Sequence, residues 1–205
     1  MNGDVVEPEP GTVGCVVLAA GAGHRFGPGG PKQLAPLAGR PLLEHALAHA
    51  AAAPIDRVIA VLGANAVEIA AEVDLHGAEP LVCAGWPEGM AAPLRAGIAA
   101  LGDCAAAVVL LGDQPLVGPA AIARVLAGRG EKWDAVRASY EGDPGHPVLI
   151  ERGLFTAIAG LEGNAGARTL LAAIQARTVP CDDVADPLDV DSPADLRAAE
   201  QALAS

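Results

Sequence analysis

The sequence predicts an α/β fold: a single-domain, Rossmann-like three-layer sandwich whose sheet is mostly parallel, with a small antiparallel excursion. Hydrophobic residues make up 52% of the 205-residue chain but aromatic residues only 2%. The core must therefore be built from Ala, Val, Leu and Ile, as it is where helices pack on a parallel sheet. Short apolar runs without polar alternation indicate strands buried on both faces. They alternate with segments of helical spacing, which predicts βαβ units.

The first half of the chain keeps this alternation. The β-branched apolar run Thr12–Ala20 predicts a central strand, and a glycine-rich loop follows it. From Pro41, apolar residues recur at helical spacing as far as Ala50, and Pro54 lies just beyond the expected end of that helix. The next predicted strands are Arg57–Leu62, Glu79–Ala84 and Ala106–Leu111, and the next predicted helices are Ala66–Glu72 and Ala92–Leu101.

The alternation breaks in the second half. After a helix at Pro119–Leu126, strand Asp134–Ser139 leads through the turn-forming Glu141–Gly145 directly into strand His146–Ile150. Two strands joined by a turn predict the antiparallel excursion. The remaining predicted elements are helices at Leu154–Gly160 and Ala167–Ala176, a strand at Thr178–Cys181, and a last helix with Ser192 as N-cap and Pro193 at its first position.

Composition excludes several classes of partner and location. The formal net charge of -12 argues against nucleic acid and anionic membrane surfaces, because both require a basic face. The four cysteines form no Cys-x-x-Cys pair, so we expect buried thiols in a reducing compartment. Residues 1–11 are acidic and rich in Pro and Gly, which predicts a disordered tail before a domain at 12–205. No secretory signal or bilayer-spanning run is present in the sequence, and the expected location is cytoplasmic.

The loop after the first strand has the composition of an anion cradle. Gly21 and Gly23 allow backbone N–H groups to approach a ligand closely, and Arg25 and Lys32 supply countercharge for phosphate. A P-loop is excluded, because Lys32 is followed by Gln33 and not by Ser or Thr. A dinucleotide-binding loop stays open as an alternative, although its third glycine comes one place late and no acid ends the second strand.

Acidic residues stand where such a loop would need a metal. Asp113 follows the most apolar predicted strand, and the carboxyl ends of strands are where open α/β sheets hold their ligands. Asp189 and Asp191 precede the last helix and lie on the same face of a short extended segment. Carboxylates of this kind are typical ligands of Mg²⁺ beside phosphate.

Several motifs together resemble the molybdenum cofactor cytidylyltransferase-like branch of the nucleotidyltransferase superfamily. Their order and spacing carry the resemblance over nearly the whole chain, from Val13 to the last helix. The motifs are LAAGAGHRFG (18–27) with Pro31-Lys32, GRPLL (39–43), VLGANA (61–66), WPEGM (86–90), LRAG (94–97), LGDQP (111–115), GHPV (145–148), GAR (166–168) and DVDSP (189–193).

The resemblance implies transfer of a nucleoside monophosphate, with CMP favoured, from a nucleoside triphosphate onto a phosphorylated acceptor such as molybdopterin, with release of pyrophosphate. Arg25, Lys32 and Asp113 would be catalytic. Asp113 and Asp191 would hold the cofactor Mg²⁺, and Asp189 stays an alternative to Asp191. The implied nucleotide-binding residues are Leu18, Ala19, Ala20, Gly21, Ala22, Gly23, Arg25, Lys32, Leu62, Gly63 and Asp113.

The acceptor side is implied at Trp86, His146 and Arg168. Each of these residues also has a structural interpretation: Trp86 as cover for the core edge, His146 as a structural histidine, and Arg168 as an exposed helix arginine. The implied partners in molybdenum cofactor biosynthesis are CTP, a phosphorylated pterin-type acceptor and a molybdoenzyme that receives the cofactor.

Three departures from the family pattern leave the substrates open. The loop Gly27–Lys32 is longer than usual, Ala91–Pro93 stand where serines are common, and Asn164 replaces an aspartate. The choice among CTP, GTP and ATP and the identity of the acceptor therefore stay open. Two other hypotheses are a nicotinamide-dependent oxidoreductase of the same family resemblance and a non-catalytic cofactor-binding chaperone. The strand-end acids distinguish them from the transferase, because hydride transfer does not need them.

Overall fold

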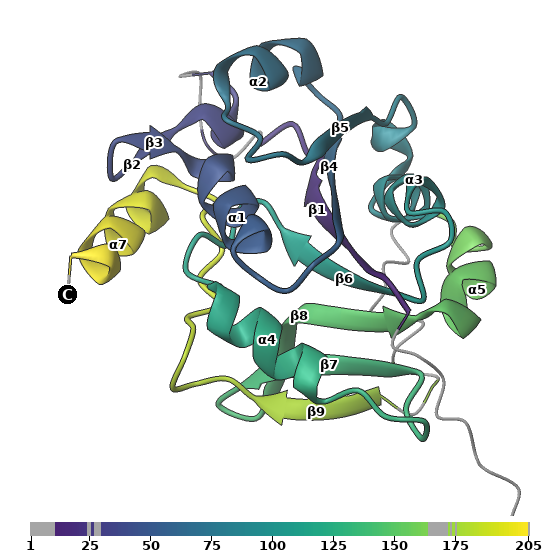
Figure 1. Ribbon diagram of the computed structural model, residues 1–205. Helices are drawn as coiled ribbons and strands as arrows, with labels where there is room; N and C mark the ends of the chain where they lie inside the picture. Colours follow the sequence, from purple (N-terminus) through teal and green to yellow (C-terminus); the bar gives the residue numbers. More distant parts are fainter. Residues whose placement is uncertain are drawn as a thin grey trace, which may run out of the picture.

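A seven-stranded sheet organises the part of the chain that the computed structural model describes, residues 11–23, 26, 30–163, 172, 174 and 176–204. Its strand order is β5-β4-β1-β6-β8-β7-β9 (Figure 1). The strands are β1 Val13–Ala19, β4 Arg57–Leu62, β5 Glu79–Val82, β6 Ala106–Leu111, β7 Ala135–Tyr140, β8 Asp143–Glu151 and β9 Ala176–Pro180.

The sheet is mostly parallel, as predicted. Strands β5, β4, β1 and β6 run parallel to one another, and β9 runs parallel to β7. The exception is β8, which pairs antiparallel with both β6 and β7. Glu141 and Gly142 form the β7–β8 turn at φ 53 and φ 88. The antiparallel excursion therefore lies inside the sheet, between β6 and β7.

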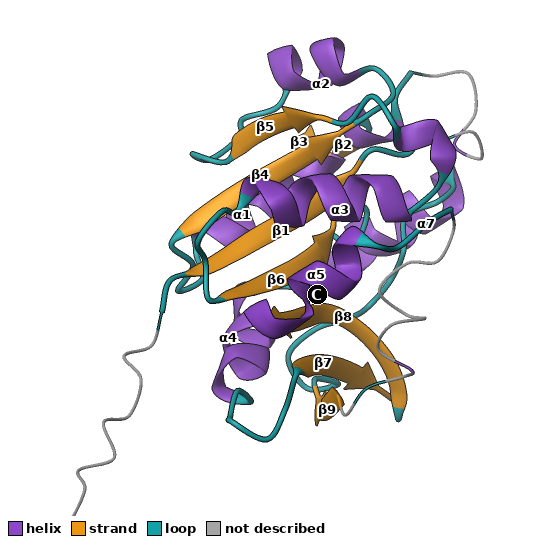
Figure 2. Ribbon diagram, turned by 90° about the vertical axis from the view of Figure 1, so that its right-hand side faces the viewer, coloured by secondary structure: helices purple, strands orange, loops and turns teal. Residues whose placement is uncertain are grey.

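Helices cover both faces of the sheet, which makes three layers (Figure 2). Alternate residues of β1 point to opposite faces, so Cys15 and Val17 join one core cluster and Val16 joins the other. The first cluster includes residues of α1 (Leu42–Ala51), α2 (Ala66–Glu72) and α4 (Pro119–Ala127), and the second includes residues of α3 (Ala91–Ala100) and α5 (Phe155–Ala159).

Close packing of α3 on the sheet depends on Gly97. A Cβ atom at this position would lie 2.4 Å from Cγ1 of Val16 and 2.9 Å from Cγ2 of Val61, which is closer than real Cβ contacts. The missing side chain thus allows the α3 backbone to approach β1 and β4. This approach brings the start of α3 next to the ends of those strands.

A small third cluster attaches the C-terminal helix. Val190 and Ala199 are fully buried against Leu37 and Leu42, beside α7 (Pro193–Leu203). The two-residue strands β2 (Pro36–Leu37) and β3 (Arg40–Pro41) form a separate antiparallel pair there, which the sequence did not predict. The described residues also include the 3₁₀ turns η2 (Lys32–Leu34), η3 (Trp86–Glu88) and η4 (Arg152–Leu154).

Most predicted elements are confirmed, with two corrections. The predicted helix Ala167–Ala176 lies largely outside the described residues, and Ala176 is instead the first residue of β9. Strand β8 begins at Asp143, within the predicted turn, because Asp143 pairs with Tyr140 and Pro144 pairs with Ser139. The predicted tail, residues 1–11, lies outside the described residues except for Gly11.

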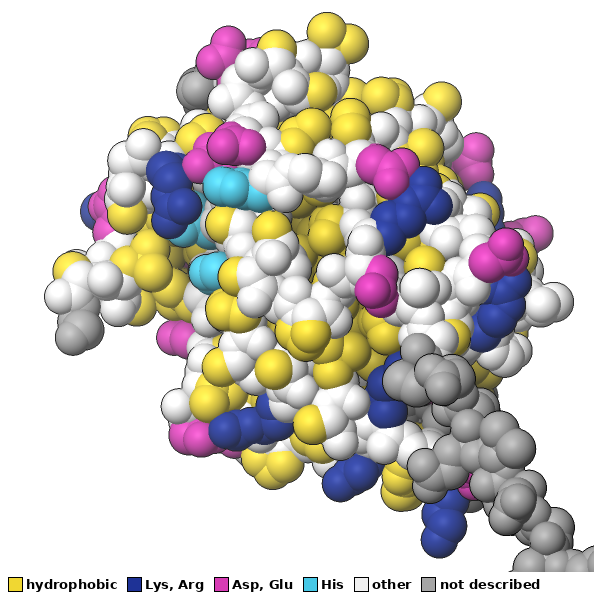
Figure 3. All heavy atoms as spheres, in the orientation of Figure 1, with side chains coloured by type: hydrophobic (Ala, Val, Ile, Leu, Met, Phe, Trp, Pro, Cys, Tyr) yellow, Lys and Arg dark blue, Asp and Glu magenta, His cyan; other side chains and the backbone are white. Residues whose placement is uncertain are grey.

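Three general features complete the description. All four cysteines are buried and unpaired, as predicted. Among the described residues, the helices are too short or too polar to cross a membrane. On the face drawn in Figure 3, basic side chains are scattered among acidic and apolar ones.

Candidate functional site

A cavity of about 580 Å³ lies where β1 and β6 end. Its wall combines the end of β1 and the glycine loop, the η2 turn, the η3 turn with the start of α3, the end of β6, and the segment that precedes α7. These pieces are far apart in the sequence but meet because the carboxyl ends of parallel strands share one edge of the sheet.

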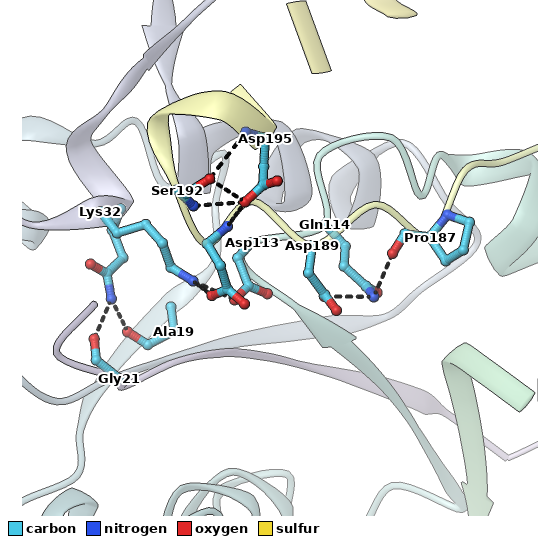
Figure 4. A network of polar contacts seen from close by, with 11 residues as sticks. Ala19, Gly21, Lys32, Asp113, Gln114, Pro187, Asp189, Ser192 and Asp195 are labelled. Carbon is cyan, nitrogen blue, oxygen red and sulfur yellow. Dashed lines mark hydrogen bonds and ion pairs between the residues drawn. The ribbon is translucent and has the colours of Figure 1, made fainter. Parts of the chain in front are cut away.

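The polar centre of this cavity is an ion triad. The Lys32 ammonium Nζ donates to Oδ2 of Asp113 at 2.7 Å and to Oδ1 of Asp191 at 2.9 Å (Figure 4). The lysine side chain is 11% exposed, and the two carboxylates are about 30% exposed. Burial lowers the pKa of Lys32, but the charges and hydrogen bonds of Asp113 and Asp191 outweigh burial and raise it overall. The ammonium is therefore charged at neutral pH.

Backbone contacts fix the two acids relative to each other. The Val190 N–H donates to the Asp113 carbonyl oxygen at 2.9 Å, which ties the segment before α7 to the end of β6. The Asp191 N–H donates to Oδ2 of Asp195 at 3.2 Å. Ser192 caps α7, since its Oγ accepts from the Asp195 N–H at 3.3 Å while Asp195 Oδ2 accepts from the Ser192 N–H at 2.8 Å. The helix cap thus holds Asp191 in place.

Asp189 has a different environment from Asp191. Its Oδ1 accepts from Nε2 of Gln114 at 3.0 Å, and the same nitrogen donates to the Pro187 carbonyl at 3.2 Å. Burial and then the nearby Asp113 charge raise the pKa of Asp189. Oε1 of Gln114 is buried and has no hydrogen-bond partner among the described residues. Both acids line the cavity, but Asp191 is the one that shares the Lys32 ammonium with Asp113.

The triad has the donor set that Mg²⁺ would need. Two carboxylates converge on one cation position, and Mg²⁺ is typically held by one or two protein carboxylates together with phosphate oxygens and water. Across the described residues, His, Cys, Asp and Glu form no group of three or more that would hold a metal. The carboxylates fit a metal that arrives with phosphate ligands of its own.

The predicted site residues divide into three groups. Four predicted site residues are described by the structure but are not part of the cavity wall: Ala22, Leu62, Gly63 and His146. Arg25 and Arg168 lie outside the described residues. The predicted residues that line the cavity are Leu18, Ala19, Ala20, Gly21, Gly23, Lys32, Trp86, Asp113 and Asp191.

Two of the residues outside the wall have clear structural contacts. Gly63 lies under Trp86, where a Cβ atom would be 2.7 Å from Cγ of the indole. The His146 carbonyl accepts from the Tyr140 hydroxyl at 2.7 Å. Burial lowers the pKa of the His146 imidazole to about 4, and the Asp113 charge only partly opposes this. His146 is thus a neutral, partly buried side chain at physiological pH.

The sequence did not identify several cavity residues. Gln33 lies in the cavity wall and contacts the glycine loop, and Gln114 lies beside the wall and contacts Asp189; both are buried amides for which the sequence predicted no role, although Gln114 belongs to the LGDQP motif. The apolar wall formed by Met90 and Pro93 beside Trp86 was also missed. Met90 ends the WPEGM motif and Pro93 lies in the departure from the family pattern at Ala91–Pro93, but neither was predicted to line the site.

Comparison with known proteins gives a consistent family. A family model described as "MobA-like NTP transferase domain" matches residues 15–179. Nicotine blue oxidoreductase of Paenarthrobacter nicotinovorans is 37% identical over 163 residues, which cover 76% of this chain and 79% of that protein. The bifunctional protein GlmU of Halorhodospira halophila is 34% identical over 148 residues, which cover 71% of this chain but only 31% of that protein.

Solved structures agree with this grouping. Rv0371c of Mycobacterium tuberculosis H37Rv superposes with a TM-score of 0.84 at 32% identity, covering 94% of this chain and 99% of that chain. A complex of Rv0371c with manganese superposes with a TM-score of 0.78 at 31% identity, covering 93% of this chain and 98% of that one.

Proposed function

The chain belongs to the MobA-like NTP transferase family, and on that premise we propose that it transfers a nucleoside monophosphate, CMP by preference, from a triphosphate to a phosphorylated pterin-type acceptor such as molybdopterin. The observation that carries the proposal is the convergence of Lys32, Asp113 and Asp191 beside the glycine loop. In the reaction, an acceptor phosphate oxygen bonds to the α-phosphorus while the bond from that phosphorus to the pyrophosphate oxygen breaks. Pyrophosphate leaves with the electron pair.

Each group of the chain has a role in this proposal. The glycine loop with Lys32, and with Arg25 from outside the described residues, binds the triphosphate and orients its α-phosphorus. Asp113 and Asp191 would hold Mg²⁺, which would neutralise charge on the phosphoryl oxygens. Lys32 then exchanges its carboxylate partners for phosphate oxygens. The manganese complex of Rv0371c supports a divalent metal, and the choice of Mg²⁺ is part of the proposal.

The acceptor and base assignments follow from the cavity. Trp86, Met90 and Pro93 supply a largely apolar wall on which a planar ring system can lie. The backbone of Ala19 and Ala20 lies on the same wall, so base and acceptor share the cavity in this proposal. Arg168 and His146 stay proposed acceptor contacts. CTP, GTP and ATP are compared by kcat/KM, and we expect CTP to have the highest value.

The direct test is pyrophosphate release from CTP and Mg²⁺ with molybdopterin as acceptor. Asp113→Asn keeps the side-chain shape but removes the charge, and we expect a loss of at least about 100-fold in kcat, because charge neutralisation carries most of the catalysis. The matched control is Asp103→Asn, since Asp103 is fully exposed and forms only a surface ion pair with Arg152. A rate for Asp113→Asn equal to that of the control contradicts the metal assignment. Chelation by EDTA should abolish the reaction.

A second candidate is a nicotinamide-dependent oxidoreductase, because nicotine blue oxidoreductase is 37% identical to the chain. A thermal-shift panel of CTP, GTP, ATP, NADPH and NADH, each with and without Mg²⁺, separates the two. A ligand of the site stabilises the folded protein by mass action. A shift with a reduced nicotinamide and none with any triphosphate favours the oxidoreductase, and a Mg²⁺-dependent shift with a triphosphate favours the transferase.

A further inference from the structure

The side chain of Gln33 is buried in the wall between the glycine loop and the η2 turn. The residue is 5% exposed. Its Nε2 donates to the carbonyl oxygens of Ala19 and Gly21, both at 2.8 Å (Figure 4). A single amide nitrogen thus uses both of its hydrogens on two residues of the loop that follows β1.

The carbonyl between these two has a different donor. The Ala64 N–H donates to the Ala20 carbonyl oxygen at 3.2 Å. This oxygen lies so close to the chain that a Cβ atom on Gly63 would be 2.4 Å from it. Three successive carbonyl oxygens at the start of the loop are therefore bound by donors of the protein. The lone pairs of these carbonyl oxygens would repel a phosphate at this position, but they accept hydrogen bonds from the protein instead.

Gln33 is also the direct neighbour of the lysine in the ion triad. Both residues belong to η2, Lys32–Leu34. The Lys32 side chain reaches the carboxylates of Asp113 and Asp191, while the Gln33 side chain reaches the loop. Gly23 packs against the same turn, since a Cβ atom there would lie 2.9 Å from Cβ of Lys32. The η2 turn thus contacts both the glycine loop and the carboxylates of Asp113 and Asp191, and it fixes the distance between them.

We infer that Gln33 is a positioning residue for the triphosphate: it holds the Ala19 and Gly21 carbonyls away from the ligand and fixes the loop relative to Lys32. The inference rests on the proposed function, because it takes a nucleoside triphosphate as the ligand of the loop. Gln33 acts through the backbone of the loop and does not itself touch the reacting atoms.

The test compares Gln33→Met, which keeps the length and burial of the side chain, with Gln201→Met, the same exchange at an exposed position on α7. We expect Gln33→Met to raise the KM for Mg·CTP about tenfold and to change kcat by less than about threefold, because the lost contacts position the ligand and do not stabilise the transition state alone. Gln33→Glu should raise KM further, because a carboxylate faces two carbonyl oxygens. Gln201→Met should leave both constants unchanged.

Hydrogen exchange of the peptide that spans Leu18–Gly23, measured without nucleotide, gives a second readout. We expect faster exchange in Gln33→Met than in the wild type or in Gln201→Met. Unchanged exchange overturns the inference, and so does faster exchange with an unchanged KM, because the amide would then serve stability alone. If the wild type binds no triphosphate, the proposed function fails, and the triphosphate part of the inference fails with it. The two failures are distinguishable, because triphosphate binding by the wild type tests the proposed function, while the comparison of Gln33→Met with the wild type tests the role of Gln33.

Discussion

At the scale of single residues, Lys32 holds together two acids that would otherwise repel each other. Its ammonium lies 2.7 Å from Asp113 and 2.9 Å from Asp191, between the two carboxylates that the proposed function assigns to the metal. A metal that enters alone has to displace this ammonium. If the metal enters bound to phosphate, the phosphate oxygens can replace the two carboxylates as hydrogen-bond partners of the lysine. Under the proposed function, we therefore expect the metal to bind together with the nucleotide.

We expect Lys32→Met to change metal binding and catalysis in opposite directions. Without the ammonium, the two carboxylates lose the cation that they share, and Mn²⁺ binding in the absence of nucleotide should tighten by about tenfold. Turnover of Mg·CTP should fall by about 100-fold or more, because a phosphate-binding charge is lost. Electron paramagnetic resonance of free Mn²⁺ measures the first effect, and pyrophosphate release measures the second.

The control for this prediction is Lys132→Met, at an exposed lysine remote from the cavity wall. It should leave both quantities unchanged. Weaker Mn²⁺ binding by Lys32→Met would mean that the lysine supports the carboxylates as a metal site and does not compete for them.

At the scale of elements, the cap of α7 links helix formation to the site. Ser192 and Asp195 satisfy each other's backbone N–H groups, and Asp195 also accepts from the N–H of Asp191. The sequence predicted this helix start from Ser192-Pro193 alone, because a capping serine and a proline at the first position act locally. It did not predict that the cap would orient a carboxylate of the cavity.

Ser192→Ala tests this link. We expect a loss of about 1 kcal/mol in the free energy of unfolding, the usual effect of removing an N-cap, and about threefold weaker Mn²⁺ binding because Asp191 loses its fixed orientation. Urea unfolding and Mn²⁺ titration measure the two effects. Glu200→Ala, at an exposed position of the same helix, should change neither. If the variant is less stable but binds Mn²⁺ as tightly as the wild type, the cap stabilises the helix and does not orient Asp191.

The sequence predicted elements accurately where a local pattern of residues marks them, and less accurately where they depend on contacts between distant segments. Arg57–Leu62, Ala66–Glu72 and Ala106–Leu111 were predicted to the residue, because burial on both faces or on one helical stripe marks the sequence itself. The pair β2 and β3 was missed because two-residue strands show no periodicity. Strand β8 was predicted too short because its first residues have turn composition but pair with β7.

The same reasoning applies to the site. Asp113 was identifiable because it ends an apolar strand, and strand ends are ligand sites in this fold class. The hydrogen bonds of Gln33 to Ala19 and Gly21 span 14 and 12 residues, and they depend on how the loop folds back over η2. No local pattern encodes such a contact. Sequence reasoning thus identified the three residues of the ion triad, but not the contacts that hold the glycine loop.

At the scale of the whole molecule, two histidines make stability depend on pH. Burial lowers the pKa of His49 below 6.5, and nearby His45 and Arg40 lower it further against the effect of its Val117 hydrogen bond. Burial lowers the pKa of His146 from 6.5 to about 4. In the unfolded chain both imidazoles take up protons as the pH falls through 6.5. In the folded protein the same imidazoles take up protons only at lower pH, because their pKa values are lowered. The folded state therefore loses stability as the pH falls below about 6.5.

We expect the free energy of unfolding to fall between pH 7 and pH 5 by about 1 to 2 kcal/mol more in the wild type than in His49→Gln/His146→Gln, because the variant has no imidazole to protonate at these positions. Urea unfolding at the two pH values, with EDTA present so that no metal binds near Asp113, measures the difference. The raised pKa of Asp189 acts in the opposite direction but is common to both proteins. Equal losses in wild type and variant would show that these imidazoles are solvated in the folded protein, and the acid sensitivity would then have to come from the carboxylates.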